Sequence, residues 1–306
     1  MQFLLNPKWD LIGKRRLALI ISGTLILIGI ISLILNKGPN YGIDFLGGTS
    51  IELQFEKSIS IAEVRATVSN AGFENAEIKS FGGANEILIR VEQQEENTEI
   101  TDAIKRSINN SFPGNPYIVQ LVEKVGPKIG AELRKSMIQA IVVALFFILI
   151  YISWRFEFIF AVAAIAALFH DVLITLGVFS VLKIEISIAI IAAFLTIVGY
   201  SLNDTIVVFD RIRENLKVLR RENYEKIVNT SLNQSLSRTV ITSFTTLFVV
   251  VILYFFGGPV IHNFAFALIV GVIVGTYSSI FIASPILVEW QKKREFKKGR
   301  PLTKKA

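Results

Sequence analysis

The sequence predicts a polytopic α-helical membrane protein, with six transmembrane helices and an α+β, ferredoxin-like extracytoplasmic domain between the first and second helix. The composition supports this fold class, because 52% of the 306 residues are hydrophobic, only 19% are charged, and the mean hydropathy is +0.54. A soluble domain has about 25% charged residues and no apolar run near 20 residues long. The segment between the first two apolar runs has the alternation of a folded α+β domain.

Six apolar segments approach the roughly 20 residues that a helix needs to cross about 30 Å of hydrocarbon. They are Leu17–Leu35, Ile138–Ser153, Phe158–Leu182, Ile186–Phe209, Val240–Phe256 and Phe264–Val288. The second and fifth segments are short, so we expect flanking residues to extend them. The first follows three basic residues, as a signal peptide would. Its length and the lack of a small-residue cleavage site favour an uncleaved anchor.

The distribution of Lys and Arg predicts the orientation. Four segments hold 20 of the 32 basic residues and alternate with two short loops that hold one, so both termini are expected in the cytoplasm. The basic side then meets anionic lipid heads, which explains the net charge of +7 better than nucleic acid does. The predicted organisation is a cytoplasmic N-terminus (1–16), a first transmembrane helix (17–35), the extracytoplasmic domain (36–135), a five-helix bundle (136–288, with a cytoplasmic amphipathic loop at 210–239) and a basic cytoplasmic tail (289–306).

The segment 36–135 reads as two β-α-β repeats. Alternating apolar residues predict four strands, and two helical segments separate them. Ser60 and Glu63 resemble a capping box at the start of the first helix, and the glycines at 82 and 83 resemble a hairpin turn. The predicted elements are Thr49–Phe55, a helix from Ser60 to Gly72, Ala76–Phe81, Glu86–Val91, the helix Thr98–Ser111, and Tyr117–Val125. This order is that of the ferredoxin-like split βαβ fold.

Polar side chains inside the predicted spans are the candidates for function, because a buried carboxylate in a membrane is costly and rare. His170 and Asp171 lie near the middle of the third span, and Asn203 and Asp204 lie in the fourth, toward its cytoplasmic side. The alternative for both pairs is a structural one, in which they form hydrogen bonds or an ion pair that fixes helix packing.

Arg238, at the start of the fifth span, is the expected partner of Asp204, since both lie toward the cytoplasmic side. It could instead snorkel to the interface as an anchor. Thr242 belongs to a run of hydroxyl residues after Arg238, which could extend a polar path or bond back to their own helix. Small residues spaced by four (Gly271, Gly275 and Ser279) predict a close helix contact.

Enzymatic and metal chemistry have little support in the sequence. There is no cysteine, and two histidines cannot form a rich metal site, so we expect no metal and no cofactor. No phosphate-binding Gly-Lys-Ser/Thr loop and no complete nucleophile elbow occur. An aspartyl protease would need Asp171 and Asp204 at one depth, and the sequence separates them. We therefore expect a non-enzymatic protein.

Three motifs resemble those of the SecF branch of the bacterial SecD/SecF family. The first, Gly42–Thr49, includes Gly42, Asp44, Gly47 and Gly48 and directly follows the first span. The second is Gly126–Gly130, with Gly126, Pro127 and Gly130, and the third is Gly199–Arg211, with Gly199, Asn203, Asp204 and Thr205. His170-Asp171 and Ser237-Arg238-Thr239 also fall where that family has them, and the resemblance extends from the first span to the last.

The resemblance implies a multi-pass protein of the bacterial plasma (inner) membrane that works with SecD beside SecYEG. Its implied role is to use the proton-motive force to assist translocation of unfolded preproteins, with YajC and YidC as further candidate partners. It implies that Asp204 and Arg238 form a proton relay, which Asn203, His170, Asp171, Thr205 and Thr242 support. The family is distantly related to the resistance-nodulation-division (RND) exporters.

Two other classes of function remain open from the residues. The chain could be half of a small-molecule exporter of the RND type, although those proteins have far larger outer domains. It could also be an assembly factor that transports nothing and whose buried polar residues are only structural. Substituting Asp204 without disturbing assembly would separate the last class from a proton-driven one.

Overall fold

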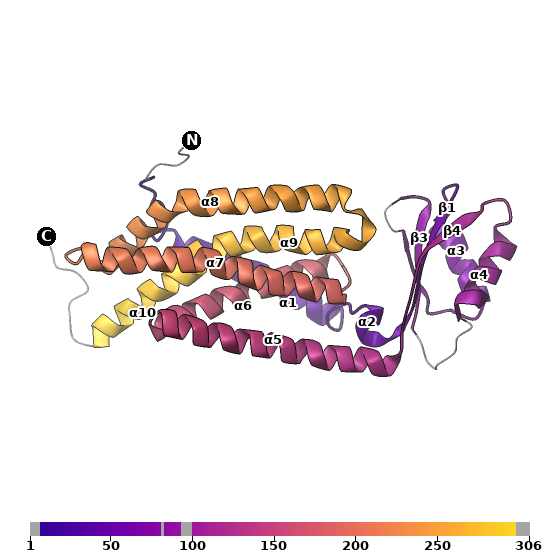
Figure 1. Ribbon diagram of the computed structural model, residues 1–306, viewed down its shortest axis with the longest axis horizontal. Helices are drawn as coiled ribbons and strands as arrows, with labels where there is room; N and C mark the ends of the chain where they lie inside the picture. Colours follow the sequence, from indigo (N-terminus) through magenta and orange to yellow (C-terminus); the bar gives the residue numbers. More distant parts are fainter. Residues whose placement is uncertain (1–6, 81–82, 93–99, 298–306) are drawn as a thin grey trace. The chain divides into compact units, whose positions relative to one another are not determined.

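The computed structural model describes residues 7–80, 83–92 and 100–297, which form two compact units (Figure 1). The helical unit comprises the described residues of Met1–Asn40, Ile141–Ile184 and Ala189–Ala306, and the sheet unit comprises those of Tyr41–Ala140 together with Glu185–Ile188. Residues 1–6 of the predicted N-terminal segment and 298–306 of the predicted basic tail lie outside the described residues. So do positions 81–82 and 93–99 of the predicted extracytoplasmic domain.

Within the described residues, six helices are long and apolar enough to cross a membrane, as the sequence predicts. The sixth candidate span, Ile261–Phe296, joins two α-helices through one π-helical turn. The helices are α1 (Arg15–Leu35), α5 (Pro127–Arg155), α6 (Phe158–Val181), α7 (Ile188–Val218), α8 (Tyr224–Phe256), α9 (Gly258–Ser278), the π turn η1 (Ser279–Ala283) and α10 (Ser284–Lys297). The two short spans are extended by flanking residues, as expected, since α5 and α8 have 29 and 33 residues.

The segment 210–239, predicted as an amphipathic loop, is mostly helical. α7 continues to Val218 and α8 begins at Tyr224, so most of this segment consists of the ends of two long helices. The apolar side chains of the early α8, including Leu232 and Leu236, are buried in one core with Phe209 of α7. They are therefore packed against protein and do not lie on a membrane surface.

Small residues let the helices approach closely at two places. A Cβ added to Gly29 of α1 would lie 2.7 Å from the Cα atom of Gly177 in α6. On α9, a Cβ at Gly275 would lie 2.9 Å from the Cβ atom of Ser201 in α7. The predicted seam of small residues on α9 is thus a contact with α7, and such contacts bring side-chain hydroxyls within reach of a neighbouring helix.

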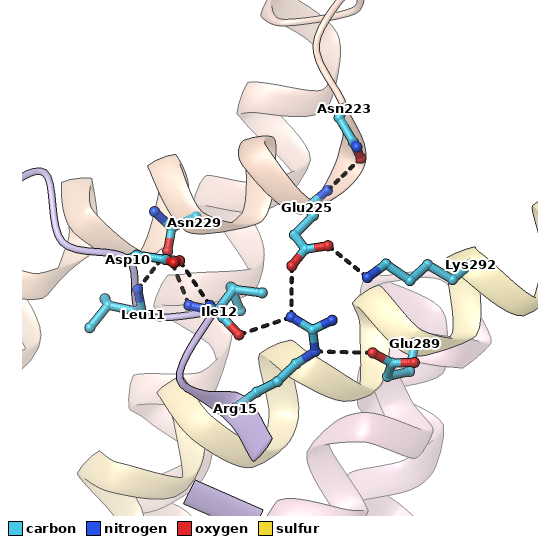
Figure 2. Close-up of polar contacts among 10 residues, drawn as sticks. Asp10, Leu11, Ile12, Arg15, Asn223, Glu225, Asn229, Glu289 and Lys292 are labelled. Atoms are coloured by element: carbon cyan, nitrogen blue, oxygen red, sulfur yellow. Dashed lines mark hydrogen bonds and ion pairs between the residues drawn. The ribbon is translucent and has the colours of Figure 1, made fainter. Parts of the chain in front are cut away.

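Ion pairs link α1, α8 and α10 at one end of the bundle (Figure 2). Arg15, at the start of α1, forms ion pairs with Glu225 of α8 at 2.6 Å and with Glu289 of α10 at 3.0 Å. Lys292 of α10 binds the same Glu225 at 2.7 Å. The side chain of Asn229 accepts hydrogen bonds from the backbone N–H groups of residues 11 and 12, so the segment before α1 is fixed along α8.

The sheet unit has the ferredoxin-like topology that the sequence predicts. Its four strands are antiparallel and lie in the order β2-β3-β1-β4, with β3 between the two strands of the first βαβ unit. Figure 1 shows α3 and α4 on one face of the sheet. The elements are α2 (Ile43–Leu46), β1 (Gly48–Phe55), α3 (Ile61–Asn70), β2 (Glu77–Ser80), β3 (Glu86–Val91), α4 (Ile100–Ser111) and β4 (Tyr117–Val125).

Alternate residues of the central strands form the core of the sheet unit with α3 and α4. Ile51 and Leu53 of β1 point to the same face and pack with Val64 of α3 and Ile104 of α4. All four side chains are at most 1% exposed. The predicted capping box is wrong in one respect: Ser60 is the N-cap residue of α3, but its side chain makes no capping hydrogen bond.

The first two glycine motifs pack on each other. Gly47 has φ +80°, and a Cβ there would lie 2.8 Å from the Cα atom of Pro127, so only glycine fits. A Cβ at Gly130 would lie 3.1 Å from the backbone nitrogen of Gly47. By contrast, a Cβ at Gly126 or Gly199 would meet no atom within 4 Å, so packing does not explain those two predicted motif glycines.

The sheet unit also includes the connection between α6 and α7. Asp44 accepts a hydrogen bond at 2.8 Å from the backbone N–H of Ile188, the first residue of α7, and so caps that helix. Arg90 of β3 forms an ion pair with Glu185 in the same connection. Burial raises the pKa of Glu185, and the neighbouring Arg90 opposes that rise.

Candidate functional site

The buried polar side chains of the helical unit form two clusters. The Asp204 cluster consists of Asp204, Ser243 and Thr276, from α7, α8 and α9. The Asp171 cluster consists of Ser22, His170, Asp171, Ser201, Tyr277 and Ser278, from α1, α6, α7 and α9. The sequence predicts both acids as functional candidates, but it does not predict that separate sets of hydroxyl groups surround them.

In the Asp204 cluster, hydroxyl groups surround the carboxyl group. Asp204 is 2% exposed, and its Oδ2 atom lies 3.2 Å from the hydroxyl oxygen of Ser243. Ser243 lies 2.6 Å from the hydroxyl oxygen of Thr276, which in turn lies 2.8 Å from the carbonyl oxygen of Val272 in its own helix. The hydroxyl of Thr242 is also close to the Asp204 carboxyl group.

This chain of hydroxyl groups fits either charge state of Asp204. When the acid is ionised, Ser243 donates to it and Thr276 donates to Ser243. When the acid is protonated, it donates to Ser243, Ser243 donates to Thr276, and Thr276 donates to Val272. The last contact lies within one helical turn, so a hydroxyl rotation makes or breaks it at small cost.

In the described part of the chain, Arg238 and Asp204 do not form an ion pair: no side-chain nitrogen of Arg238 lies within 4.0 Å of a carboxylate oxygen of Asp204. Arg238 is exposed on α8, although it is near enough to Asp204 for an electrostatic interaction. Asn203 is also exposed, so it does not join the cluster. The hydroxyl of Thr242 bonds back to the carbonyls of residues 238 and 239, both at 3.0 Å, which is the local alternative that the sequence left open.

Two buried hydroxyl groups lie next to Asp204 and Arg238 in the sequence. Thr205 of α7 and Thr239 of α8 are 1% and 2% exposed. Neither side-chain oxygen has a hydrogen-bond partner among the described residues. Buried hydroxyls without a protein partner are suited to bind water.

In the Asp171 cluster, every oxygen of the acid has a partner. The Oδ1 atom of Asp171 lies 2.9 Å from Nδ1 of His170, the preceding residue on α6. The Oδ2 atom accepts hydrogen bonds from Ser201 of α7 at 2.6 Å and from Ser278 of α9 at 2.8 Å. Asp171 is 1% exposed. The structure thus brings His170 and Asp171 into contact with each other and with a set of hydroxyl groups separate from the set around Asp204.

Four residues of this cluster were not among the candidates from the sequence: Ser22, Ser201, Tyr277 and Ser278. The signal that could have identified them is a hydroxyl group within an apolar span. Ser22 lies 2.9 Å from Nε2 of His170 and 3.0 Å from the hydroxyl of Tyr277. The π turn η1 begins directly after Ser278, and π turns within helices often mark functional sites.

The described residues contain no group of three or more His, Cys, Asp or Glu side chains that could hold a metal ion. The Asp204 cluster combines a carboxyl group with hydroxyl groups, and the Asp171 cluster also contains the imidazole of His170. Such groups exchange protons readily, and both clusters lie in helices long enough to span a membrane.

Comparison with known proteins identifies the family. Residues 103–293 match the model for the C-terminal region of the protein export membrane proteins SecD and SecF, and residues 32–59 match the SecD/SecF GG motif. The chain belongs to the SecD/SecF family. The GG motif region includes Gly47 and Gly48, whose backbone lies against Pro127 and Val91 within the sheet unit.

Curated SecD/SecF family members are similar over nearly the whole chain. The chain is 47% identical to the protein translocase subunit SecF of Desulfurispirillum indicum, over 90% of each sequence. It is also 47% identical to the SecF subunit of Calditerrivibrio nitroreducens, over 91% of this chain and 92% of that one. The family and the six apolar helices together indicate a multi-pass membrane protein.

Solved structures of the family have the same fold. The crystal structure of SecDF from Thermus thermophilus, described as a translocon-associated membrane protein, matches with a TM-score of 0.85 and 40% identity over 95% of this chain. A structure of SecDF in a super-membrane-facing form matches with a TM-score of 0.72 and 39% identity. The chain spans 40% and 41% of these two SecDF chains.

Proposed function

We propose that this chain is the SecF half of a SecD–SecF unit that uses the proton-motive force to assist protein export. It does so in the inner membrane of a bacterium, with both termini in the cytoplasm, and it acts beside the SecYEG channel on unfolded preproteins. The chain breaks no covalent bond in this role. The names of its relatives support the proposal, since they are SecF translocase subunits, and the longer SecDF chains combine such a half with a second one.

The observation that supports proton coupling most strongly is the arrangement around Asp204. Its carboxyl group is buried among hydroxyls, and no cation binds it within hydrogen-bonding distance in the described residues. The hydroxyl chain through Ser243 and Thr276 fits both the ionised and the protonated acid. A group that can change its charge without breaking its surroundings is suited to take up and release a proton. The buried hydroxyls of Thr205 and Thr239 are suited to bind the water that brings it.

Arg238 supports the need for a second subunit. Its side chain is exposed on α8, a helix that is a candidate span, and a guanidinium facing lipid is strongly unfavourable. A carboxylate on SecD would neutralise Arg238 in one state of the cycle. In another state Arg238 would turn toward Asp204 and expel its proton, because a nearby cation favours the ionised acid.

The energy available is sufficient for such a cycle. One charge crossing a potential of 100 mV gains about 2.3 kcal/mol, which shifts a two-state equilibrium by between one and two powers of ten. α7 contains Asp204, and its first residue, Ile188, is hydrogen-bonded to Asp44 of the GG motif. The same helix therefore reaches both the proposed proton site and the sheet unit. A movement of α7 on protonation would therefore be passed to the sheet unit.

Asp204→Asn tests the proposal, because asparagine keeps the size of the side chain but cannot titrate. Export into inverted membrane vesicles would be measured with and without an imposed proton gradient. We expect the stimulation by the gradient to be lost, while the complex with SecD still assembles. The matched control is Asp210→Asn on the same helix, where the acid is partly exposed and pairs with Arg155 at 3.4 Å.

Arg238→Lys keeps the charge but loses the planar, forked donor, so we expect a reduced stimulation by the gradient rather than a complete loss. If Asp204→Asn assembles normally and retains full stimulation by the gradient, Asp204 is structural. The chain would then act as an assembly factor and not as a proton-driven subunit.

A further inference from the structure

The Asp171 cluster contains a chain of hydrogen bonds whose direction is fixed by its last member. We propose that His170 and Asp171 form a second proton-binding site of the helical unit, which keeps one proton between the two side chains. This site is separate from Asp204, and the proposal does not depend on whether export is proton-driven.

The direction of the chain follows from the carbonyl oxygen of Ala18 in α1. This oxygen can only accept, and the hydroxyl of Tyr277 lies 2.7 Å away, so the single proton of the phenol lies between them. The bond of 3.0 Å between Tyr277 and Ser22 then needs the proton of Ser22. The bond of 2.9 Å between Ser22 and His170 in turn needs a proton on Nε2 of the ring. His170 therefore holds a proton on Nε2 in this arrangement.

The other ring nitrogen faces the acid. Nδ1 of His170 lies 2.9 Å from Oδ1 of Asp171, and two bare lone pairs at that distance would repel each other. Because Nε2 already has a proton, a further proton must lie between Nδ1 and Oδ1. Its presence makes the two side chains together neutral, either as imidazolium and carboxylate or as imidazole and carboxylic acid. Neutrality removes the large cost of an isolated charge in a buried site.

The hydroxyls at Oδ2 favour the first of these forms. Ser201 and Ser278 both donate to Oδ2 of Asp171, at 2.6 and 2.8 Å, and donors stabilise the ionised carboxylate. The ring of His170 also stacks on that of Tyr277, with centroids 5.9 Å apart and an angle of 22° between the planes. The geometry points to an imidazolium that lies between its counterion and an aromatic ring.

No other charge faces this site from the neighbouring helices. His170 and Asp171 are the only titratable side chains of α6. The charged residues of α1 lie at its start, and those of α10 begin at Glu289, which forms an ion pair with Arg15 at one end of the bundle. α9 has Tyr277 and, near its other end, His262, whereas η1 has no titratable residue.

α7 is the remaining neighbour of the site. It has Asp204 one turn from Ser201, and the Asp204 carboxyl group bonds to Ser243 of α8. α9 reaches the two clusters with different residues, Thr276 and Ser278, which are two positions apart and so point in different directions.

The test measures the protons on the ring directly. The chain has two histidines, so the full-length protein in lipid bilayers, labelled with ¹⁵N-histidine, gives two ring systems by solid-state NMR. At a pH of about 7.5 a free histidine is mostly neutral. We expect His170 to show a proton on Nε2 and a second one shared by Nδ1. A bare Nε2, or a bare Nδ1 beside an ionised Asp171 in the ¹³C carboxyl spectrum, would overturn the proposal.

Tyr277→Phe sharpens the test, because it keeps the ring and removes the hydroxyl that fixes the direction of the chain. Ser22 can then donate to Nε2, so we expect the ring to lose its proton there and the shared proton signal to shift or vanish. The matched control is Tyr254→Phe, since Tyr254 packs on the other histidine, His262, at a centroid distance of 4.0 Å. An unchanged His170 spectrum in Tyr277→Phe would show that the chain does not hold the proton.

Discussion

Two buried aspartates lie in neighbouring helices of the same bundle, and their surroundings differ in kind. Asp171 has a histidine beside it and two serine donors, and its hydrogen-bond chain ends on a tertiary contact between α9 and α1. Asp204 has hydroxyl neighbours, and its chain ends on a carbonyl of the same helical turn. The first chain runs in one direction, whereas the second can run in either.

The comparison teaches how one fold can hold a proton at one acid and exchange it at another. A partner on a distant helix fixes the direction of a chain, because reversing it would leave two oxygens facing each other without a proton. A carbonyl in the same turn fixes the direction less firmly, because that local bond is broken at smaller cost. We therefore infer that Asp171 contributes to stability and Asp204 to function.

The largest expected effect is on stability at Asp171. Asp171→Ala leaves the imidazolium of His170 without its counterion and two serine hydroxyls without an acceptor, so we expect a loss of about 3–5 kcal/mol in the free energy of unfolding. Asp204→Ala removes one long hydrogen bond, and we expect a loss nearer 1 kcal/mol. Unfolding in mixed detergent micelles, followed by circular dichroism, measures both. Equal losses of unfolding free energy in the two variants would contradict the inference that Asp171 contributes more to stability than Asp204.

A smaller effect is expected at the helix contact beside the Asp171 cluster. Gly29→Leu pushes α1 away from Gly177 of α6, and overpacking of this kind costs about 1–3 kcal/mol. It should also loosen the bond between Ser22 and His170, because Ser22 lies two turns earlier on the same helix. The control is Gly23→Leu, where an added Cβ atom meets no atom within 4 Å. A melting temperature that falls equally in both variants would contradict the proposed role of this contact.

The sequence predicted the architecture well, because hydrophobic length and alternation are properties of single segments. The six spans and the order of strands β1 to β4 follow from such local signals, and the structure agrees. The prediction differed from the structure at 210–239, where a loop was expected and the ends of two helices are found. The apolar face of this segment is satisfied by the protein core, and amphipathicity alone does not distinguish a lipid from a protein neighbour.

The candidate site was predicted in part. Asp204, His170 and Asp171 could be found because charged or titratable groups in an apolar span are rare. Their division into two clusters could not, since it depends on which side of α9 Thr276 and Ser278 face and on the close approach at Gly275. The expected contact between Arg238 and Asp204 is absent in the described residues, because Arg238 faces outward from α8.

A pair of serine substitutions, one in each cluster, separates the roles of the two acids. Ser201→Ala removes a donor from an ionised carboxylate, and hydrogen bonds to charged groups contribute about 1.5–3 kcal/mol, so we expect a measurable loss of stability. Ser243→Ala removes the hydroxyl that links Asp204 to Thr276, and we expect a loss of about 1 kcal/mol or less.

The two variants should have the opposite order in function. Export stimulated by the proton gradient should fall several-fold in Ser243→Ala, because the reversible chain is broken, and should remain near normal in Ser201→Ala at a temperature where that variant is folded. Measuring unfolding and export on the same membrane preparations gives both readouts. If Ser201→Ala loses export while Ser243→Ala retains it, the exchanging proton belongs to Asp171, and the roles assigned to the two acids are reversed.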